Sequence, residues 1–565
     1  MWNNINNLIL MFCLTFNMPK NGYSFKTGIR NISGKIIRSI KNFDYYDIAA
    51  IFIVIFFSFI FILFSFIQYM SLNDSAFDLG LHTNMLYTFL HGRLFYTTLL
   101  GYGYFTEHLS LFEFFQVPVY YIYRSPESLL IFQDIFISTA GIIIYKISRI
   151  FFNDKLKNTG IISLSFLFAY EISPYTQSLV SFPFHNMAFL PFFFFLAFYA
   201  FLTEKRILNY FSLAMIISLH ANFVYIVAVI LLYEFLYLRT NKGKNIKMWL
   251  SKKHNAHKNI NTVYFIIFII MLYAYTVFAS IIKGHISISP STGATSAVSD
   301  SPVGIILLLF RNPKLFSGIL LSNYPSKYFF VTFSMKALIF MPLFSPMALI
   351  MALPYMLYAM PSSYASYYEF GYQYSSMLVA PIFLASIIGL YNIMRITGYI
   401  KNKINKKYKK IKNVNIKGFT TTIAIIIIIV SLITIQYGII SPGSDFKSPY
   451  GSAMENINEM HVSGAYSFLA NVSNNIPGNS YILTENSLMP YFSNHINIYS
   501  TPYTPNIYNN LSRFQYIIIQ YNSFWATTTI SKPSLQEIAY SGLNNGTYHV
   551  IDEYKPADIF VLERS

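Results

Sequence analysis

Long apolar stretches alternate with short polar segments along most of the chain. The first runs from Ile48 to Met70, and about twenty such residues are enough to cross a bilayer as a helix. Similar stretches recur, and they predict an all-α polytopic membrane domain over residues 46–440. The further predicted spans are 127–149, 158–178, 185–203, 262–283, 327–342, 344–360, 376–395 and 419–440.

Residues 207–238 are also apolar, but basic residues flank them on both sides. One straight helix would carry one basic flank to the outer face, whereas Lys and Arg favour the cytoplasmic side. We therefore predict two half-length helices broken at "SLHAN", residues 218–222, which brings the total to about eleven crossings. Because short broken helices at membrane depth usually line a cavity, we expect this junction to face an outer cavity.

Composition supports a membrane protein and predicts its orientation. The chain of 565 residues is 54% hydrophobic and 11% charged, about half the charge of a soluble domain. Its net charge of +17 comes from short basic clusters between the apolar stretches, and the densest, 395–417, has no acidic residue. Such clusters mark cytoplasmic loops, so we predict a multi-pass protein of the cell membrane with a cytoplasmic N-terminal segment, 1–45. No basic and aromatic platform accompanies the clusters, and we expect no nucleic-acid partner.

Residues 441–565 differ from the rest, because acidic residues outnumber basic ones there. Five short runs have strand character, namely "SYIL", "INIY", "YIIIQ", "YHVID" and "DIFVLE". Between the first two, "TENSLMPYF" predicts a helix capped by Asn486 or Ser487. An odd number of crossings places this segment outside, so we predict a small extracytoplasmic α/β domain.

The first outer loop, residues 71–126, carries two predicted interfacial helices. "HLSLFEFFQVPVYYIY" predicts the second of them, with Glu107 and His108 at its start. The first, "FDLGLHTNMLYTFLHG", is amphipathic, and the apolar residues expected to hold it on the membrane are Phe77, Leu81, Met85 and Phe89.

The order of several weak motifs resembles a known family over most of the chain. The motifs are "FDLGLHTNMLYTFLHGR", "EHLSLFEFFQVPVYYIYRSPESLLIFQDIFISTAGIIIYKISR", "FPFHNMAFLPFFFFLAFYAF", "MPLFSPMALIMALPYMLYAM", "YQYSSMLVAPIFLASIIGLY", "SLMPYFSNHINIYSTP" and "YHVIDEY". The family is the prokaryotic membrane-protein family called domain of unknown function 2079, which is grouped with the GT-C glycosyltransferases. One position departs from the resemblance, because many relatives have Lys-Glu-Asp where this chain has His220-Ala221-Asn222.

The resemblance implies a GT-C-like membrane enzyme that uses a polyprenyl-phosphate sugar donor. The acceptor would be an extracytoplasmic glycan, lipid or protein, and the lipid bilayer would be a partner. It also implies an essential acid just after the first span, a place held here by Asp78, with Glu107 where some GT-C enzymes have a metal-binding acid. A divalent metal ion is therefore a candidate cofactor, and Asp78, Glu107 and His108 are its candidate ligands.

The chemistry of sugar transfer fits residues of the same loop. Inverting transfer needs a base for the acceptor and positive groups for the departing phosphate. Asp78 shares a helix face with His82 at a spacing of four residues. We expect Asp78 to line an outer cavity together with Glu107, His108 or His185. The candidate catalytic residues are Asp78, His82, Glu107, His108 and His185, and the candidate substrate-binding residues are Arg93, Arg124, Lys336, His220 and Tyr374.

Each of these residues also has a plainer interpretation. Asp78 fits the start of a helix, where the dipole favours acids. His185 fits a cap before a span, and His220 fits a role in satisfying backbone groups freed by the helix break. Tyr374 fits an interfacial aromatic belt.

Two other classes of function remain open. A lipid or solute transporter or flippase would also need broken helices, although the hydropathy pattern has no inverted repeat and the polar residues gather at the outer interface. An envelope scaffold without catalysis would use residues 441–565 to bind partners.

Overall fold

The computed structural model describes most of the chain from residue 44 onward. Ala50–Ser565 forms one compact unit. The predicted span 262–283 and Glu107 lie outside the described residues. The described residues are 44–106, 108–152, 159–240, 308–362, 364–408, 416–439, 441, 450–451, 453–459, 464–501, 503–504, 507–527 and 533–565.

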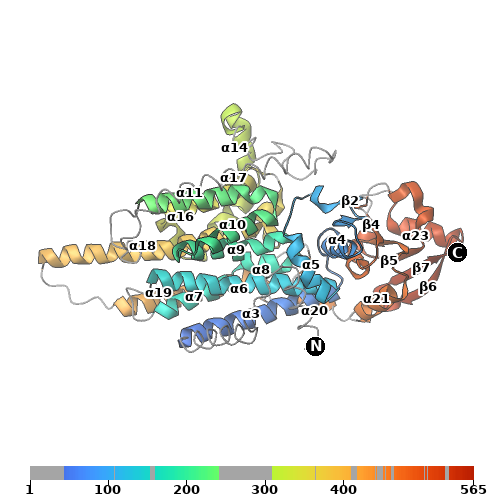
Figure 1. The fold of residues 1–565 in the computed structure, drawn as a ribbon, viewed down its shortest axis with the longest axis horizontal. Helices are drawn as coiled ribbons and strands as arrows, with labels where there is room; N and C mark the ends of the chain where they lie inside the picture. Colours follow the sequence, from blue (N-terminus) through green and yellow to red (C-terminus); the bar gives the residue numbers. More distant parts are fainter. Residues whose placement is uncertain are drawn as a thin grey trace, which may run out of the picture. The chain divides into compact units, whose positions relative to one another are not determined.

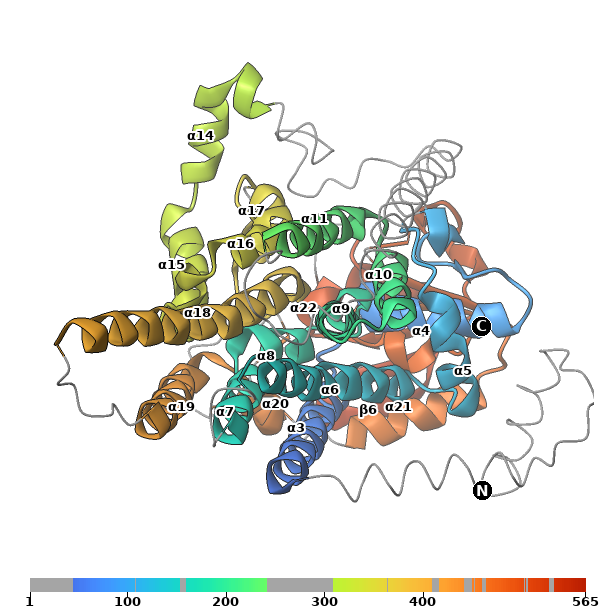
Figure 2. The same ribbon diagram turned by 60° about the vertical axis from the view of Figure 1, so that its left-hand side comes forward.

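Most of the described chain is helical. The helices before the C-terminal region are α3 (Tyr45–Met70), α4 (Leu81–Leu90), α5 (Glu113–Ile122), α6 (Pro126–Phe152), α7 (Thr159–Glu171), α8 (Pro174–Ser181), α9 (Leu190–Leu202), α10 (Arg206–Leu219), α11 (Val224–Thr240), α14 (Pro313–Leu321), α15 (Tyr324–Lys336), α16 (Pro346–Leu349), α17 (Leu353–Ala359), α18 (Ser376–Tyr408) and α19 (Ile416–Thr434). In Figures 1 and 2, α14 stands apart from the other helices, and none of its side chains is buried.

Three helical stretches of the described chain are long and apolar enough to cross a membrane. They are α3, α6 and the segment Gln373–Ile400, which contains most of the apolar part of α18. They match the predicted spans 48–70, 127–149 and 376–395. The other apolar helices have 10–17 residues, so about eleven full-length crossings are not confirmed. Proline lies in the first turn of two of these helices, Pro174 in α8 and Pro191 in α9, where its missing N–H costs no intrahelical hydrogen bond.

The predicted break at residues 218–222 is present. Helix α10 ends at Leu219, His220 is extended with φ −162° and ψ 135°, and a 3₁₀ turn, η4 (Ala221–Phe223), leads into α11. Two helices therefore replace one long helix, as the flanking basic residues predict.

The prediction of two membrane-spanning helices at 327–342 and 344–360 is wrong. The chain here is a series of short pieces, in which α15 is followed by η6 (Met341–Phe344), α16, η7 (Ile350–Ala352) and α17. Ile339 and Phe340 have φ of 54°, which a continuous helix cannot contain. The turn η6 packs directly on α18, and a Cβ at Gly389 would come 1.9 Å from the Met341 carbonyl oxygen.

The C-terminal region holds the five predicted strands in one mixed sheet. The order is β4-β3-β5-β7-β6, in which β3 pairs in parallel with β4 and β5, and β7 pairs antiparallel with β5 and β6. The strands and helices are β3 (Tyr481–Glu485), β4 (Asn497–Thr501), β5 (Tyr516–Gln520), β6 (Tyr548–Tyr554), β7 (Ile559–Arg564), α20 (Ala453–Glu459), α21 (Gly464–Asn475), α22 (Phe524–Thr527) and α23 (Leu535–Asn544).

Alternating side chains give the sheet two apolar faces. Leu483, Ile517 and Leu562 pack with Leu535 and Ile538 of α23. The neighbouring positions in the strands join the large core that continues into the membrane helices; they are Ile482, Ile518 and Val561, together with Ala465 and Leu469 of α21. The sheet is therefore packed on the helical bundle through one face.

The first outer loop lies between the bundle and the sheet (Figure 1). Leu81 and Met85 of α4 are buried, and Asn84 donates to the carbonyls of Ser493 and His495, at 3.0 and 2.9 Å. The prediction that Leu81 and Met85 hold α4 on the membrane is therefore wrong, because both side chains are buried in the protein and Asn84 binds the C-terminal region. The short hairpin β1 (Tyr96–Thr97) and β2 (Tyr102–Gly103) follows α4.

The predicted helix in "TENSLMPYF" is reduced to a 3₁₀ turn, η12 (Met489–Phe492). Asn486 caps a different element, because its Oδ1 accepts from the Ala76 amide at 2.9 Å. This contact ties the C-terminal region to the loop after α3. Gly80 permits it, since a Cβ there would come 2.3 Å from Sδ of Met489.

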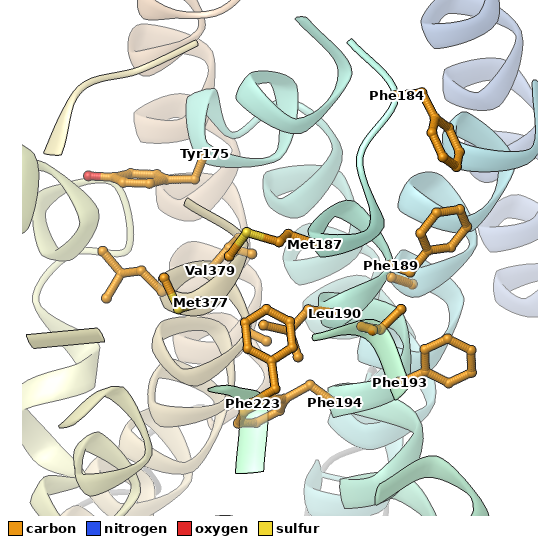
Figure 3. Packing of buried hydrophobic residues seen from close by; sticks show 14 of the residues in the cluster. Tyr175, Phe184, Met187, Phe189, Leu190, Phe193, Phe194, Phe223, Met377 and Val379 are labelled. Atoms are coloured by element: carbon orange, nitrogen blue, oxygen red, sulfur yellow. The ribbon is translucent and has the colours of Figure 1, made fainter. Parts of the chain in front are cut away.

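The bundle core is rich in aromatic side chains. Figure 3 shows Phe189, Leu190, Phe193, Phe194 and Phe223 gathered in one cluster at the start of α9 and beside η4. Burial of these side chains fixes the starts of α9 and α11. A 3₁₀ turn leads into each of these two helices, and His185 and His220 each lie one residue before that turn.

Candidate functional site

Asp78 lies in a short π-helical turn, η1 (Ala76–Gly80), between α3 and α4. The chain leaves α3 through Leu72, whose φ is 62°, and Ser75 caps η1 by accepting from the Phe77 amide at 3.2 Å. The turn continues directly into α4, so Asp78 and His82 remain on one face.

Two hydroxyl groups and one imidazole act on the Asp78 carboxylate. The Tyr450 hydroxyl donates to Oδ2 at 3.3 Å. Burial raises the pKa of Asp78 to about 6, although a positive charge on His82 and hydrogen bonds from Ser75 and Tyr450 lower it. Asp78 is therefore mostly ionised at pH 7, with a pKa near the range of a general base.

A second acid, Asp74, lies close to Asp78 but has a different charge state. Burial raises the pKa of Asp74 to about 8, the Gln68 side chain lowers it, and the negative charges of Asp78 and Glu127 raise it further. Asp74 is therefore mostly protonated at pH 7 while Asp78 is mostly ionised. Two neighbouring carboxyls whose pKa values are separated in this way suit different roles.

Helix α5 directs its polar side chains inward. Glu113, Gln116 and Tyr120 are buried, whereas Phe114 and Phe115 are exposed. The spacing of three and four residues places the buried polar groups on one face. The second helix predicted in the first outer loop is present, but it begins at Glu113, and His108 lies before it.

Glu113 joins α5 to α4 and to the start of α9. Its Oε1 lies 3.5 Å from Nδ1 of His82 and also accepts from Nδ2 of Asn186. Asn186 in turn donates to Oγ of Ser110 at 2.9 Å and accepts from Nε2 of Gln116. A buried carboxylate next to an imidazole fixes the orientation of the ring, so Glu113 is a positioning residue for His82.

Four histidines from four segments gather beside this network. The His82 and His185 ring centres are 6.1 Å apart, and those of His108 and His220 are 5.1 Å apart. Tyr104 links the two pairs, with its ring centre 5.2 Å from that of His82 and 5.8 Å from that of His108. We call these four residues the histidine cluster.

The structure brings together Asp78, His82, His108, His185 and His220, which are five of the ten candidate residues. The other candidates lie at other contacts, or outside the described residues in the case of Glu107. Arg93 and Arg124 are exposed, with their guanidinium groups over the rings of Tyr96 and Tyr121. Lys336 is exposed at the end of α15, and Tyr374 packs its ring 4.3 Å from that of Tyr367.

Several residues of the network carry no clear signal in the sequence. Asn186, Gln116 and Tyr450 are polar residues in apolar or tyrosine-rich surroundings, and only the fold brings them to Glu113 and Asp78. A buried acid in an otherwise apolar helix is a signal that points to Glu113.

A divalent metal ion does not fit the described part of this site. Among the described residues, no group of three or more His, Cys, Asp or Glu side chains is arranged to hold one. Nδ1 of His185 accepts from the Met187 amide at 3.2 Å, and Nδ1 of His220 accepts from the Asn222 amide at 3.1 Å. A metal-binding histidine instead donates from its second nitrogen, so these two rings have the opposite arrangement.

A small cavity lies elsewhere in the bundle, among α7, α15, α18 and α19. It contains none of the candidate residues. Its lining includes Ser173, Tyr175, Ser334, Leu378 and Thr434. The expected cavity beside Asp78 stays a prediction.

Comparison with known proteins identifies a family. A family model described as "Predicted membrane protein (DUF2079)" matches residues 68–557. No curated protein matches the chain. The structure is similar to two solved structures of ArnT from Cupriavidus metallidurans, each 9% identical to it. The structure bound to undecaprenyl phosphate covers 90% of this chain and 97% of that one with a TM-score of 0.44, and the apo structure covers 89% and 97% with a TM-score of 0.41.

Proposed function

Since the chain belongs to the family described as predicted membrane protein (DUF2079), which fits its multi-pass fold, we propose that it is a membrane glycosyltransferase. It transfers a sugar from a polyprenyl-phosphate-linked donor to an acceptor at the outer membrane face. The observation that carries this proposal is the position of the Asp78 carboxyl beside the histidine cluster, where Tyr450 contacts Asp78 and Glu113 contacts His82.

Asp78 is the general base in this proposal. Its carboxylate accepts the proton of the acceptor hydroxyl as the acceptor oxygen attacks the anomeric carbon of the sugar. A carboxylate with a pKa of about 6 is ionised at neutral pH and still basic enough to accept a proton in the transition state. Asp74, mostly protonated at that pH, adds little negative charge that would oppose a phosphate nearby.

The polyprenyl phosphate leaves when the bond between the anomeric carbon and the phosphate oxygen breaks. The electron pair of that bond stays on the phosphate, whose charge must then be stabilised. The imidazoles of the histidine cluster supply N–H donors for this purpose. An extracytoplasmic glycan, lipid or protein provides the acceptor hydroxyl.

The position of Asp78 shortly after the end of α3 suits a sugar donor whose polyprenyl chain is anchored in lipid. A polyprenyl chain stays among acyl chains while its phosphate-sugar head lies at the surface, so the base belongs on the first residues beyond a span. Exposed aromatic side chains on the outer side of α5, such as Phe114 and Phe115, give the adjoining surface an apolar character that suits lipid contact.

The test is a reconstitution with defined donors. The protein is placed in vesicles with a panel of polyprenyl-phosphate sugars and with membrane extract as the acceptor source, and mass spectrometry follows the lipids. The proposal expects protein-dependent conversion of one donor to polyprenyl phosphate. Donor that changes leaflet without being cleaved would indicate a flippase, and donor that neither moves nor reacts would favour a scaffold.

A further inference from the structure

Two arginines from distant segments lie over aromatic rings where the first outer loop meets the C-terminal region. Arg93, shortly after α4, has its Cζ atom 5.6 Å from the ring centre of Tyr96 in β1. Arg513, shortly before β5, has its Cζ atom 4.2 Å from the ring centre of Tyr499 in β4 and 4.8 Å from that of Phe514. Such stacking holds a guanidinium group in a fixed plane and leaves the N–H groups at its edge for hydrogen bonds.

The fold brings these two arginines to one place. Oγ1 of Thr98, which follows β1 directly, donates to the carbonyl of Ile498 in β4, the edge strand of the sheet. Ile498 is the neighbour of Tyr499. Burial raises the pKa of the Tyr499 phenol, while the positive charges of Arg513 and Arg93 lower it, so both guanidinium groups lie close enough to act on the same hydroxyl.

Neither arginine has a negatively charged partner among the described residues. No carboxylate there lies within ion-pair distance of either guanidinium group. Arg93 is exposed and Arg513 is half-buried, and Nε of Arg513 is enclosed without a hydrogen-bond partner in the described structure. A guanidinium group that is partly removed from water and lacks a counter-charge is costly, so an external anion would stabilise this arrangement.

Tyrosine rings complete the surface. Tyr481 of β3 is 37% exposed and is stacked on Tyr499, with ring centres 6.1 Å apart and an angle of 11° between the rings. Tyr96 and Tyr499 are half-buried. A tyrosine offers an apolar ring on which the C–H face of a sugar can pack, and a hydroxyl that can bind sugar hydroxyls. We call Arg93, Tyr96, Tyr481, Tyr499 and Arg513 the arginine–tyrosine surface.

The chemistry of this surface favours one kind of partner. The guanidinium fork binds carboxylate, phosphate or sulfate oxygens through two parallel hydrogen bonds. A lipid headgroup also offers such oxygens, but it lacks the flat rings that tyrosine side chains pack on. A glycan that carries acidic groups offers both, and two arginines match a chain with more than one acidic group.

We propose that the arginine–tyrosine surface binds the oxyanion groups of an acidic extracytoplasmic glycan. That this glycan is the acceptor of the transferred sugar rests on the proposed function, whereas the binding does not. Helix α4 separates the surface from Asp78, and its 10 residues are about 15 Å long. The acceptor would therefore be an extended chain that is held at this surface and reaches Asp78 at one end.

Three substitutions separate charge from geometry. Arg93→Gln and Arg513→Gln each remove one guanidinium fork and keep a polar side chain. Arg513→Lys keeps the positive charge but loses the fork and its stacked plane, and it stands in if Arg513→Gln does not fold. The matched control is Arg311→Gln, because Arg311 is exposed and lies just before α14, which stands apart from the other helices (Figure 1).

The experiment measures binding to the full-length protein in nanodiscs of uncharged lipid. The probes are an oligogalacturonate, a sulfated galactan oligosaccharide, a neutral galactan oligosaccharide, polyglutamate and vesicles of phosphatidylglycerol. We expect an acidic oligosaccharide to bind, and the comparison of the first two probes shows which oxyanion is preferred. Each of the three arginine variants should weaken this binding by about tenfold, as the loss of one hydrogen bond to a charged group does. Arg311→Gln should bind as the unaltered protein does.

Four results would overturn the proposal. They are no binding of either acidic oligosaccharide, equally tight binding of the neutral one, equally tight binding of polyglutamate or of the vesicles, and unchanged affinity in all arginine variants that thermal unfolding shows to be folded. Sugar transfer is measured separately. Arginine-dependent glycan binding without transfer would contradict the proposed function and support this surface. Transfer whose KM for the acceptor is the same in all variants would support the proposed function and contradict the role of the surface.

Discussion

At the scale of single residues, the proposed sugar transfer depends on the charge state of Asp78. Its pKa of about 6 is the balance of burial, which raises it, against His82, Ser75 and Tyr450, which lower it. A base must be ionised, so the rate of transfer should be constant above about pH 7 and should fall about tenfold per unit below pH 6.

Tyr450→Phe should shift the fall of the transfer rate at low pH, which is the acidic limb of the pH profile. The substitution removes the hydroxyl that donates to Oδ2 of Asp78, so the pKa of Asp78 rises and the rate begins to fall at a higher pH. A pH profile of kcat/KM measures the shift. Tyr540→Phe, which changes an exposed tyrosine of α23, is the control and should leave the profile unchanged. An unmoved acidic limb in Tyr450→Phe would show that Asp78 does not control it.

Glu485 provides a residue-scale test of stability in the C-terminal region. Burial raises the pKa of this carboxyl to about 8, while hydrogen bonds from Ser523, the Gln520 amide and Ser487 lower it. The folded state thus holds a proton that the unfolded state releases near pH 4.5. The contribution to stability is complete below that pH and is lost as the pH rises through about 8.

Glu485→Gln should flatten this dependence, because the amide cannot ionise. The measurement is thermal unfolding between pH 5 and pH 9, in which the variant should lose less stability with rising pH than the unaltered protein. Glu553→Gln, at an exposed position, should follow the unaltered protein. Parallel curves for Glu485→Gln and the unaltered protein would contradict the assignment.

The sequence identified some site residues because they stand out in an apolar chain. Asp78 and His82 follow a span, and His185 and His220 interrupt apolar stretches. Asn186, Gln116 and Tyr450 did not stand out, because short polar side chains recur throughout the chain and their partners are more than sixty residues away. Contacts at such separations follow from the fold alone.

At the scale of elements, the sequence pattern predicts those helices and strands whose form depends on nearby residues. The break at His220 follows from basic residues at both ends of one apolar stretch, and the five strands follow from β-branched and aromatic runs. The form of residues 327–360 did not follow, because the apolar pattern there is continuous while proline and two residues with positive φ interrupt the helix.

The contact between η6 and α18 gives a prediction with an internal control. Gly389→Ala places a Cβ 1.9 Å from the Met341 carbonyl oxygen, which must move, so we expect a loss of about 1–3 kcal/mol of stability from overpacking. Gly398→Ala lies on the same helix, where a Cβ would meet no atom of the described residues within 4 Å apart from its own helix backbone, and it should be neutral or stabilising. Thermal unfolding in detergent compares them, and equal melting temperatures would contradict the close contact.

At the scale of the whole molecule, the sequence predicts which segments share a side of the membrane. Residues 396–418 should be cytoplasmic and residues 441–565 extracytoplasmic. The only cysteine is Cys13, so Cys13→Ser gives a background free of thiols. Single cysteines at Lys403 and at Asn545 can then be tested in intact cells with a thiol reagent that does not cross membranes. We expect labelling at 545 and protection at 403, and the reverse pattern would overturn the topology.

The sequence pattern does not predict how the first outer loop packs against the C-terminal region. The first outer loop was expected to lie on the membrane, yet α4 is buried against the C-terminal region through Asn84, and Asn486 caps the turn that holds Asp78. An amphipathic pattern shows that a helix has an apolar face, but does not show whether lipid or protein covers it. The C-terminal region thus helps to position the site that the loop provides.

The most direct test of the account is the transfer rate of Asp78→Asn in vesicles that contain the converted donor and acceptor. The amide keeps the size of the side chain but cannot accept the proton, so we expect transfer to be slower by about 10²-fold or more, with unchanged thermal unfolding and unchanged donor binding. Asp552→Asn, at an exposed position on β6, should transfer at the normal rate. A folded Asp78→Asn protein that transfers sugar as fast as the unaltered one would contradict the central claim.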